Sequence, residues 1–67
     1  MRNSIAVRRK KLKLSQAEIA ELTKVTRQTI NAIENDKYDP SLTLAFRLAE
    51  VLNTTVDTLF DYGARRN

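Results

Sequence analysis

Cysteine and histidine are both absent from this chain of 67 residues. Without cysteine there is no disulfide, no thiolate metal site and no cysteine nucleophile; without histidine the commonest general base and metal ligand is missing. Glycine and proline occur once each, and so few breaks favour helices over a β fold with many turns. We therefore expect a helical protein that is not an enzyme and that holds neither metal nor cofactor.

Long apolar runs are missing as well. No segment approaches the ~20 residues of a membrane-spanning helix, and residues 1–11 lack the apolar segment of a signal peptide. We expect a cytoplasmic protein that does not enter a membrane. Apolar residues make up 42% of the composition, which is too many for a disordered chain. The length predicts a single domain over residues 1–67, with a frayed basic tail at 64–67.

Positive charge is concentrated in the N-terminal part of the chain. Lys and Arg number 12 against eight Asp and Glu, and residues 1–37 hold nine of the basic side chains but four of the acidic ones. A basic face on a small domain indicates a polyanionic partner, with nucleic acid first and an anionic membrane second. The alternative is that residues 8–13 form a solvated helix end whose charges suit the helix dipole. Charge alone does not decide between the two.

Helical periodicity runs through almost the whole sequence and predicts five helices. Ser15 and Glu18 form a capping-box pattern before the second helix, and Thr26, Ser41 and Thr55 are N-cap candidates for the next three. The predicted helices cover roughly 3–11, 16 to 22 or 23, 27–34, 42–52 and a short segment after residue 55. The second and third helices are joined by residues 23–25 alone, a connection short enough for a helix-turn-helix.

Apolar positions at helical spacing predict the core. In the first three helices, inward-facing side chains are expected at Ile5, Leu12, Ile19, Ala20, Leu22, Ile30 and Ile33. The fourth helix is apolar over about 220° of its circumference, so it must be covered on more than one side. We expect the apolar surplus near the C-terminal half of this helix and the short helix after it. The candidates for a dimer interface are Val51, Val56, Leu59 and Phe60, and the sequence does not separate interface from core among them.

Three segments resemble the helix-turn-helix of the Cro and phage-repressor type, the XRE family of bacterial and phage regulators. They are residues 14–20 (LSQAEIA), 25–35 (VTRQTINAIEN) and 38–42 (YDPSL), and the likeness extends from residue 5 to residue 60. The resemblance implies an all-α fold, a compact five-helix bundle of the lambda-repressor-like type, in which helices 2 and 3 form the helix-turn-helix. It also implies a nucleoid-associated transcriptional regulator, bacterial or phage-encoded, that binds double-stranded DNA and represses as a homodimer on a palindromic operator.

Three residues depart from the pattern of this family. Lys24 and Asp36 stand where the family often has glycine, which supplies a positive φ. Lys24 in that conformation would carry a strain of roughly 1 kcal/mol, so this departure bears on the geometry of the turn. Arg8 stands where the family often has leucine, and this substitution thins the core near the first helix.

One polar arc of the third helix lies opposite its apolar positions on a helical wheel. The expected base-contacting residues on this arc are Arg27, Gln28, Asn31 and Ala32. Arginine can bond guanine through two acceptors, glutamine or asparagine can do the same for adenine, and the alanine methyl can contact thymine. Phosphate contacts are expected at Gln16 and, secondary to its role as a cap, at Thr26. The segment that holds Asn35, Lys37 and Tyr38 resembles the phosphate-contacting loop of the family, and the alternative for the last two is a solvated side chain. A long-range positive field is expected from Lys10, Lys11 and Lys13.

Two opposite charges occupy apolar sides of their helices. Arg9 lies between Ile5 and Leu12 on the first helix, and Glu34 borders Ile30 on the third. Since a lone buried charge is very costly, the two are predicted to form a partly buried salt bridge. The resemblance agrees, because the family commonly pairs an Arg and a Glu at these places.

A second class of function stays open beside DNA binding. The alternative is a small protein-interaction module, such as an antitoxin or anti-regulator, whose main partner is another protein. Tight binding to a short palindrome in preference to random DNA separates the two. The sequence offers no evident site for a small-molecule effector.

Overall fold

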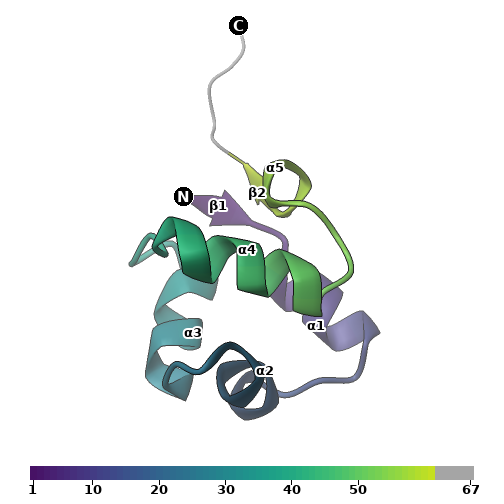
Figure 1. The fold of residues 1–67 in the computed structure, drawn as a ribbon. Coiled ribbons are helices and arrows are strands. Elements are labelled where there is room, and N and C mark those ends of the chain that lie inside the picture. Colours follow the sequence, from purple (N-terminus) through teal and green to yellow (C-terminus); the bar gives the residue numbers. More distant parts are fainter. Residues whose placement is uncertain (62–67) are drawn as a thin grey trace, which may run out of the picture.

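Seven short elements follow one another in the part of the chain that the structure describes. The structure, a computed structural model, describes residues 1–61, and the expected tail at 64–67 lies outside them. The elements of this part are β1 (Arg2–Asn3), α1 (Ile5–Lys11), α2 (Gln16–Thr23), α3 (Arg27–Glu34), α4 (Leu42–Val51), α5 (Val56–Leu59) and β2 (Phe60–Asp61) (Figure 1). The predicted five-helix bundle is therefore confirmed, with a small pair of strands added to it.

Side-chain oxygens cap four of the described helices, as the sequence predicts. Ser15 Oγ accepts from the Glu18 N–H at 3.0 Å while the Ser15 N–H donates to Glu18 Oε1 at 2.8 Å, which completes the capping box. Thr26, Ser41 and Thr55 accept equivalent bonds from the third residue of α3, α4 and α5, at 3.2, 3.2 and 3.3 Å. Each bond satisfies a backbone donor that a helix cannot satisfy itself.

The pairing of β1 with β2 is a feature that the sequence did not predict. The strands form an antiparallel ladder in which Asn3 lies opposite Phe60. Asn3 Oδ1 accepts from the Ile5 N–H at 3.1 Å, and Asn3 Nδ2 donates to the carbonyl of Ile33 at 2.9 Å. The first helix therefore begins at Ile5 and not near Asn3. Strands of two residues carry no alternation that a sequence pattern could reveal.

Left-handed residues end four of the described helices, and none of them is glycine. Their φ values are 60°, 63°, 61° and 57° at Lys13, Lys24, Asp36 and Asn53. At the end of α2, the Lys24 N–H donates to the Glu21 carbonyl at 3.2 Å and the Val25 N–H donates to the Ala20 carbonyl at 3.0 Å. This is the Schellman arrangement. The positive φ suspected at Lys24 and Asp36 is confirmed, and the other two positions were missed.

Replacing Lys24 by glycine should stabilise the domain. Glycine removes the Cβ contact that disfavours left-handed backbone, and its greater freedom in the unfolded chain offsets part of this gain. We expect Lys24→Gly to raise the free energy of unfolding by up to about 1 kcal/mol. The matched control is Lys10→Gly in the last turn of α1, where the backbone is helical, and it should lower the free energy of unfolding by up to about 1 kcal/mol. Urea denaturation of both variants is the measurement, and a loss of stability in Lys24→Gly would contradict the strain.

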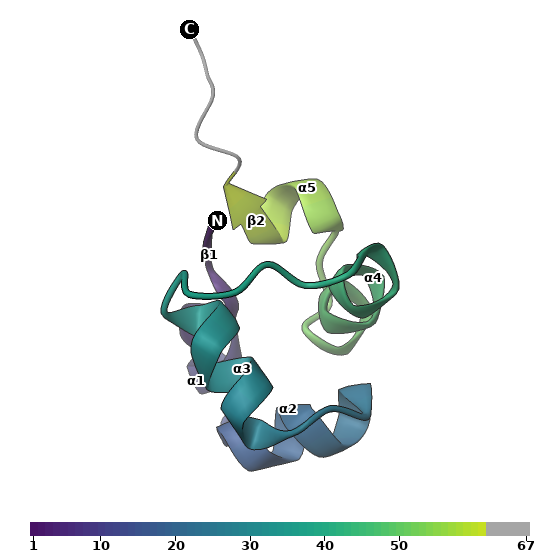
Figure 2. The ribbon, with the colours of Figure 1, turned by 90° about the vertical axis from the view of Figure 1, so that its left-hand side faces the viewer.

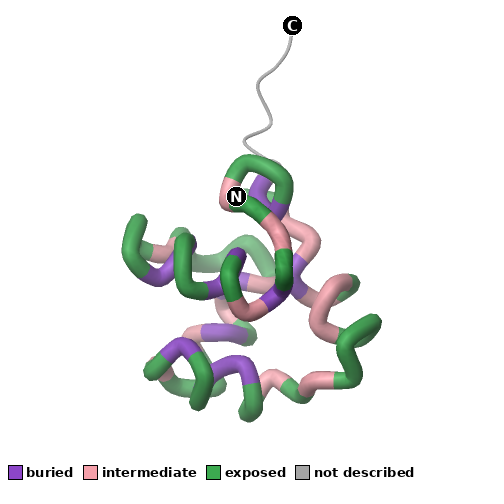
Figure 3. The backbone as a smooth tube through the Cα atoms, turned by 45° about the vertical axis from the view of Figure 1, so that its right-hand side comes forward, coloured by how far each residue is buried: buried purple, intermediate pink, exposed green. Residues whose placement is uncertain are grey.

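One hydrophobic core joins all the helices of the described part. In both ribbon views α4 lies between α2 below it and α5 above it (Figures 1 and 2), and the buried stretches of the chain face one another across the interior (Figure 3). The buried apolar residues are Ile5, Ile19, Ala20, Ile30, Ile33, Leu44, Ala45, Leu48, Ala49, Leu52, Leu59 and Phe60. No helix within residues 1–61 is long and apolar enough to cross a membrane.

Two leucines predicted to face inward lie at the surface instead. Leu22 is 55% exposed because the buried face of α2 runs through Ile19, Ala20 and Thr23, and Leu22 lies to one side of it. Leu12 is 41% exposed because α1 ends just before it. Thr23 is fully buried in place of Leu22, and its hydroxyl donates to the Ile19 carbonyl at 2.8 Å. The bond to the preceding turn is what allows a polar side chain to occupy a core position.

The apolar surplus of α4 lies at its N-terminal half and not at its C-terminal half as predicted. Leu42 is 69% exposed and Phe46 is 60% exposed. Leu59 and Phe60, two of the four expected interface residues, are instead buried in the core of the single chain. The reason is the β1–β2 ladder, which holds Phe60 beside the N-terminal strand and closes α5 over α4. The other two candidates, Val51 and Val56, are partly buried against the core.

Candidate nucleic-acid interface

The helices α2 and α3 form a rigid pair joined by a tight turn. The residues between them are 24–26, and the Schellman bonds of Lys24 and Val25 fix the exit of the chain from α2. Val25 packs against the core, and Ile30 and Ile33 anchor one side of α3 within it. Because this anchored side fixes the rotation of α3 about its helix axis, the opposite side of α3 faces outward.

The outward side of α3 carries the residues expected to contact bases. Arg27, Gln28 and Asn31 are exposed, and Ala32 is half-buried beside them. A convex row of a guanidinium and two amides presents hydrogen-bonding groups of the kind that match base edges in the major groove. The structure places these four residues on one surface, which is the arrangement predicted from the wheel.

A buried ion pair links α1 to α3 behind this surface. Arg9 Nε donates to Glu34 Oε2 at 2.8 Å and Arg9 Nη2 donates to Glu34 Oε1 at 3.2 Å, so the pair is bidentate. A third donor of the guanidinium, Nη1, bonds the Leu14 carbonyl at 3.0 Å. The two side chains are 12% and 6% exposed. The Arg9–Glu34 salt bridge predicted from misplaced charges is thus present in the structure, and it is almost fully shielded from water.

The ion pair continues outward as a chain of amides that reaches the exposed side of α3. Gln16 Nε2 donates to Glu34 Oε1 at 2.9 Å and to Asn31 Oδ1 at 3.2 Å. Asn35 Nδ2 donates to the Asn31 carbonyl at 2.8 Å and to Asn31 Oδ1 at 3.2 Å. We call these residues, with Arg9, the amide relay. Sequence reasoning placed all five residues in the site or behind it but did not foresee that they touch.

The residues expected to contact phosphate lie around the outward side of α3, in different settings. Asn35, Lys37 and Tyr38 are exposed after the end of α3. The hydroxyl of Thr26 is occupied as the cap of α3. Both amide hydrogens of Gln16 have acceptors inside the protein, which leaves the first backbone N–H groups of α2 as the donors that a phosphate could use there.

A shallow hollow connects the start of α3 to the loop that follows it. Its lining consists of Thr26, Gln28, Thr29, Ala32, Lys37 and Tyr38. Thr29 is a site residue that sequence reasoning missed, and its hydroxyl lies 3.0 Å from that of Thr26. Its position one helical turn after the N-cap Thr26 was the feature of the sequence that could have identified it. Residues 1–61 contain no group of three or more Asp, Glu, His or Cys side chains that could hold a metal ion.

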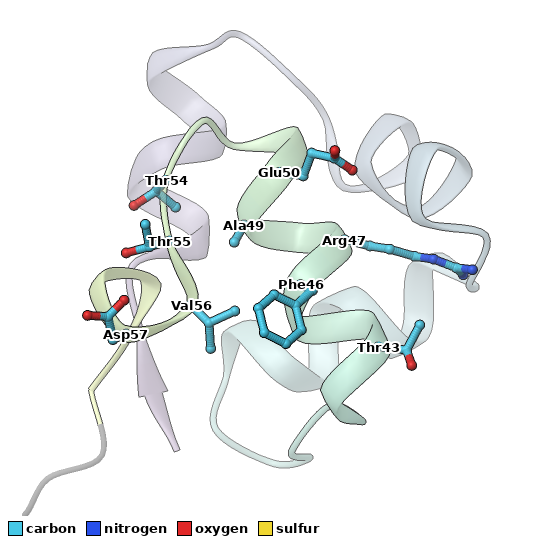
Figure 4. Close-up of a pocket in the computed structure, with 9 residues that line it drawn as sticks. All are labelled: Thr43, Phe46, Arg47, Ala49, Glu50, Thr54, Thr55, Val56 and Asp57. Atoms are coloured by element: carbon cyan, nitrogen blue, oxygen red, sulfur yellow. The ribbon is translucent and has the colours of Figure 1, made fainter.

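A second hollow lies on another surface, between α4 and α5. Its lining is Thr43, Phe46, Arg47, Ala49, Glu50, Thr54, Thr55, Val56 and Asp57 (Figure 4). Phe46 of α4 and Val56 of α5 lie side by side in it, and Arg47 and Glu50 project from α4. We call it the α4–α5 groove. It combines the exposed Phe46 and the half-buried Val56 with charges of both signs.

The helix-turn-helix family model matches residues 5–59 of the chain. An uncharacterized HTH-type transcriptional regulator of Methanocaldococcus jannaschii is 42% identical over 62 residues, which cover 92% of this chain and 94% of that protein. Another, of Methanothermobacter thermautotrophicus, is 54% identical over 52 residues, or 78% of this chain and 75% of that one. A third, YgzD of Bacillus subtilis, is 35% identical over 60 residues, or 90% and 91%.

Two solved structures share the fold of this chain. Hydroxypropylphosphonic acid epoxidase from S. wedmorenis superposes with a TM-score of 0.78 at 31% identity, over 90% of this chain. This chain covers 32% of the epoxidase, so the likeness concerns about a third of that protein. The clp gene regulator ClgR from Corynebacterium glutamicum superposes with a TM-score of 0.75 over 79% of this chain and 56% of that one. Its identity is 19%, so this second likeness is one of fold alone.

Proposed function

Because the chain belongs to the helix-turn-helix family, we propose that it is a transcriptional regulator that binds double-stranded DNA and represses by occupying an operator. The observation that carries this proposal is the row of exposed donors and acceptors at Arg27, Gln28 and Asn31, on a helix anchored by the core and by the Arg9–Glu34 ion pair. The names of its relatives, HTH-type transcriptional regulators, support the same reading. Binding, and not catalysis, is the activity proposed.

In the proposed complex α3 lies in the major groove. Arg27 and Gln28, in its first turn, approach base edges most deeply, and Asn31 and Ala32 follow one turn later. Lys37 and Tyr38 lie at the far end of the hollow beside α3, where a phosphate of the groove wall would sit. The excess of basic side chains in residues 1–37 attracts DNA of any sequence and accelerates the encounter.

A selection of bound duplexes from random DNA tests this function. A regulator of this kind should enrich one sequence with two-fold symmetry, whose half-site centres are about 34 Å apart. A pool that remains random after selection would contradict the proposal. It would favour the alternative of a protein-interaction module whose main partner is another protein.

We further propose that the protein acts as a two-fold dimer. One recognition helix reads too few base pairs to select a genomic site, and a symmetric dimer doubles the number. The exposed apolar side chains Leu42 and Phe46 supply the surface, next to the half-buried Val56. In an isologous contact Phe46 of each copy enters the α4–α5 groove of the other. Arg47 and Glu50, both exposed at the groove, give each copy a charge of either sign to pair with its partner.

Phe46→Asp should separate the dimer without unfolding the monomer, because Phe46 is 60% exposed within one chain. Sedimentation at micromolar concentration should give a dimer for the wild type and a monomer for Phe46→Asp. The matched control is Val7→Asp, an apolar side chain on α1 that is 57% exposed and outside the groove, and it should remain dimeric. A Phe46→Asp variant that sediments with the wild type would refute this interface, and a wild type that is monomeric even on a palindromic duplex would refute the dimer.

A further inference from the structure

The orientation of the Asn31 amide is fixed by the amide relay. The relay starts at Arg9, a side chain that is always a donor and never an acceptor. Arg9 holds the Glu34 carboxylate, which is acceptor-only when ionised. The side chain of Gln16 lies 2.9 Å from Glu34 Oε1 and must therefore turn its NH₂ group toward it. From this point every hydrogen bond in the relay has a defined direction.

The same logic extends from Gln16 to the exposed side of α3. The second hydrogen of Gln16 Nε2 points to the Asn31 side chain at 3.2 Å, so the atom that receives it must be the carbonyl oxygen Oδ1. The hydrogen bonds of Asn35 independently identify the same atom of Asn31 as the carbonyl oxygen. Its Nδ2 donates to the Asn31 backbone carbonyl at 2.8 Å, which identifies it as a donor, and it also donates to Asn31 Oδ1 at 3.2 Å.

Asn31 is left with one kind of hydrogen-bonding group facing outward. A carbonyl oxygen has two lone pairs, and on Asn31 Oδ1 both are taken by donors from Gln16 and Asn35. Its Nδ2 group, with two hydrogens, has no hydrogen-bond partner among the described residues, and the side chain is exposed. Turning the Asn31 amide over would place its NH₂ group against the NH₂ groups of Gln16 and Asn35. Turning the Gln16 amide over as well would relieve the first clash, but it would place the Gln16 oxygen against the Glu34 carboxylate.

We propose that Asn31 acts in DNA recognition as a donor only and selects guanine. This inference rests on the proposed DNA-binding function. Guanine presents two adjacent acceptors, N7 and O6, in the major groove, whereas adenine presents N7 beside an amino group. The bidentate contact by which asparagine reads adenine needs a free carbonyl oxygen, and Asn31 has none. The Asn31–adenine contact expected from residue type alone is thereby replaced by a contact with guanine.

The other four residues of the relay determine this specificity by positioning Asn31 and not by contacting the base. Gln16 and Asn35 position the Asn31 amide, and Glu34 and Arg9 position Gln16. An ion pair buried between α1 and α3 thereby sets which base the protein prefers at one base pair.

The experiment compares base preferences of variants by selection from random duplexes, with the full chain. Asn31→Ala first identifies the base pair whose preference depends on this side chain. At that position the wild type should favour guanine over adenine by roughly tenfold. Asn31→Asp is nearly isosteric, keeps an oxygen for Gln16 and Asn35, and replaces the outward donor by an acceptor. It should lose guanine and gain cytosine or adenine, the bases that present an amino hydrogen.

A second variant tests the relay itself. Gln16→Met removes one of the two donors to Asn31 Oδ1 while keeping the length of the side chain, so that oxygen gains a free lone pair with which to accept from the amino group of adenine. The guanine preference over adenine should then fall to within about threefold, whatever happens to overall affinity. The matched control for Asn31→Asp is Asn53→Asp, the same amide-to-acid change at an exposed residue that follows α4 and lies outside the proposed DNA-binding surface. It should leave the base preference at the Asn31 position unchanged.

Four results would overturn the inference. They are a wild-type preference for adenine at the Asn31 position, no position that responds to Asn31→Ala, an unchanged preference in Asn31→Asp, and an unchanged preference in Gln16→Met. A wild type that selects no sequence at all would instead remove the DNA-binding function on which the inference rests. The two failures are therefore distinguishable.

Discussion

Glu34→Ala is expected to lower the free energy of unfolding by about 3–5 kcal/mol, the usual cost of breaking a buried ion pair from one side. Arg9, whose side chain is 12% exposed in the intact protein, would keep its bond to the Leu14 carbonyl but would have no counter-charge. Small domains are typically stable by ~5–15 kcal/mol, so a large part of the total would be lost. Thermal and urea unfolding followed by circular dichroism would measure it, with a melting temperature lower by roughly 12–40 °C.

Two further variants separate the ion pair from a general effect of losing a carboxylate. Glu21→Ala is the same change on the exposed side of α2 and should alter stability by less than about 0.5 kcal/mol. The double variant Arg9→Met with Glu34→Met removes both charges and should recover much of the loss, because paired apolar side chains need no counter-charge. A Glu34→Ala variant as stable as Glu21→Ala would contradict the burial of this pair.

Arg27→Ala is expected to weaken binding to the selected operator by about 1–3 kcal/mol per half-site and to relax the preference at one base pair. Arg27 is exposed at the first position of α3, where a guanidinium can bond two acceptors of guanine. The measurement is a titration of labelled operator and of a shuffled duplex at several salt concentrations.

Lys37→Ala is the matched control, since it removes one positive charge from an exposed side chain outside α3. It should weaken the operator and the shuffled duplex alike and reduce the slope of affinity against salt by about one. If Arg27→Ala behaved in the same uniform manner, Arg27 would be a phosphate contact and the assignment of the reading side of α3 would be wrong.

The predictable part of the fold came from signals that act over a few residues. A hydroxyl side chain predicts the start of a helix because it satisfies a backbone donor there, as it does at Ser15, Thr26, Ser41 and Thr55. The spacing of Ile30 and Ile33 was enough to decide which side of α3 faces the core. Local rules of this kind need no knowledge of the remaining chain.

The parts that could not be predicted depend on contacts between distant residues. The β1–β2 ladder joins residues at opposite ends of the described chain, and it is the reason that Phe60 belongs to the core and not to a dimer surface. Leu22 and Thr23 are neighbours on α2, and which of them is buried depends on how α4 packs against that helix. Hydrophobicity alone favoured the leucine, and packing selected the threonine.

The candidate site shows the same division. The exposed residues of α3 were predictable one by one from the helical wheel, and so was the Arg9–Glu34 pair from its two misplaced charges. That Gln16 stands between this pair and Asn31 was not predictable, because it requires the side chains of α2 and α3 to meet at hydrogen-bonding distance. The hydrogen bonds of the relay determine which atom of the Asn31 amide accepts and which is left to donate, and a helical wheel does not contain that information.

The most direct test of sequence-specific DNA binding is the ratio of two dissociation constants, measured at one salt concentration near the physiological value. One belongs to the selected operator and the other to a shuffled duplex of the same length and base composition, which carries the same phosphate charge. A regulator that reads bases through α3 should bind the operator at least about 10³-fold more tightly. A ratio near one would mean that charge alone attracts DNA, and it would contradict recognition by α3.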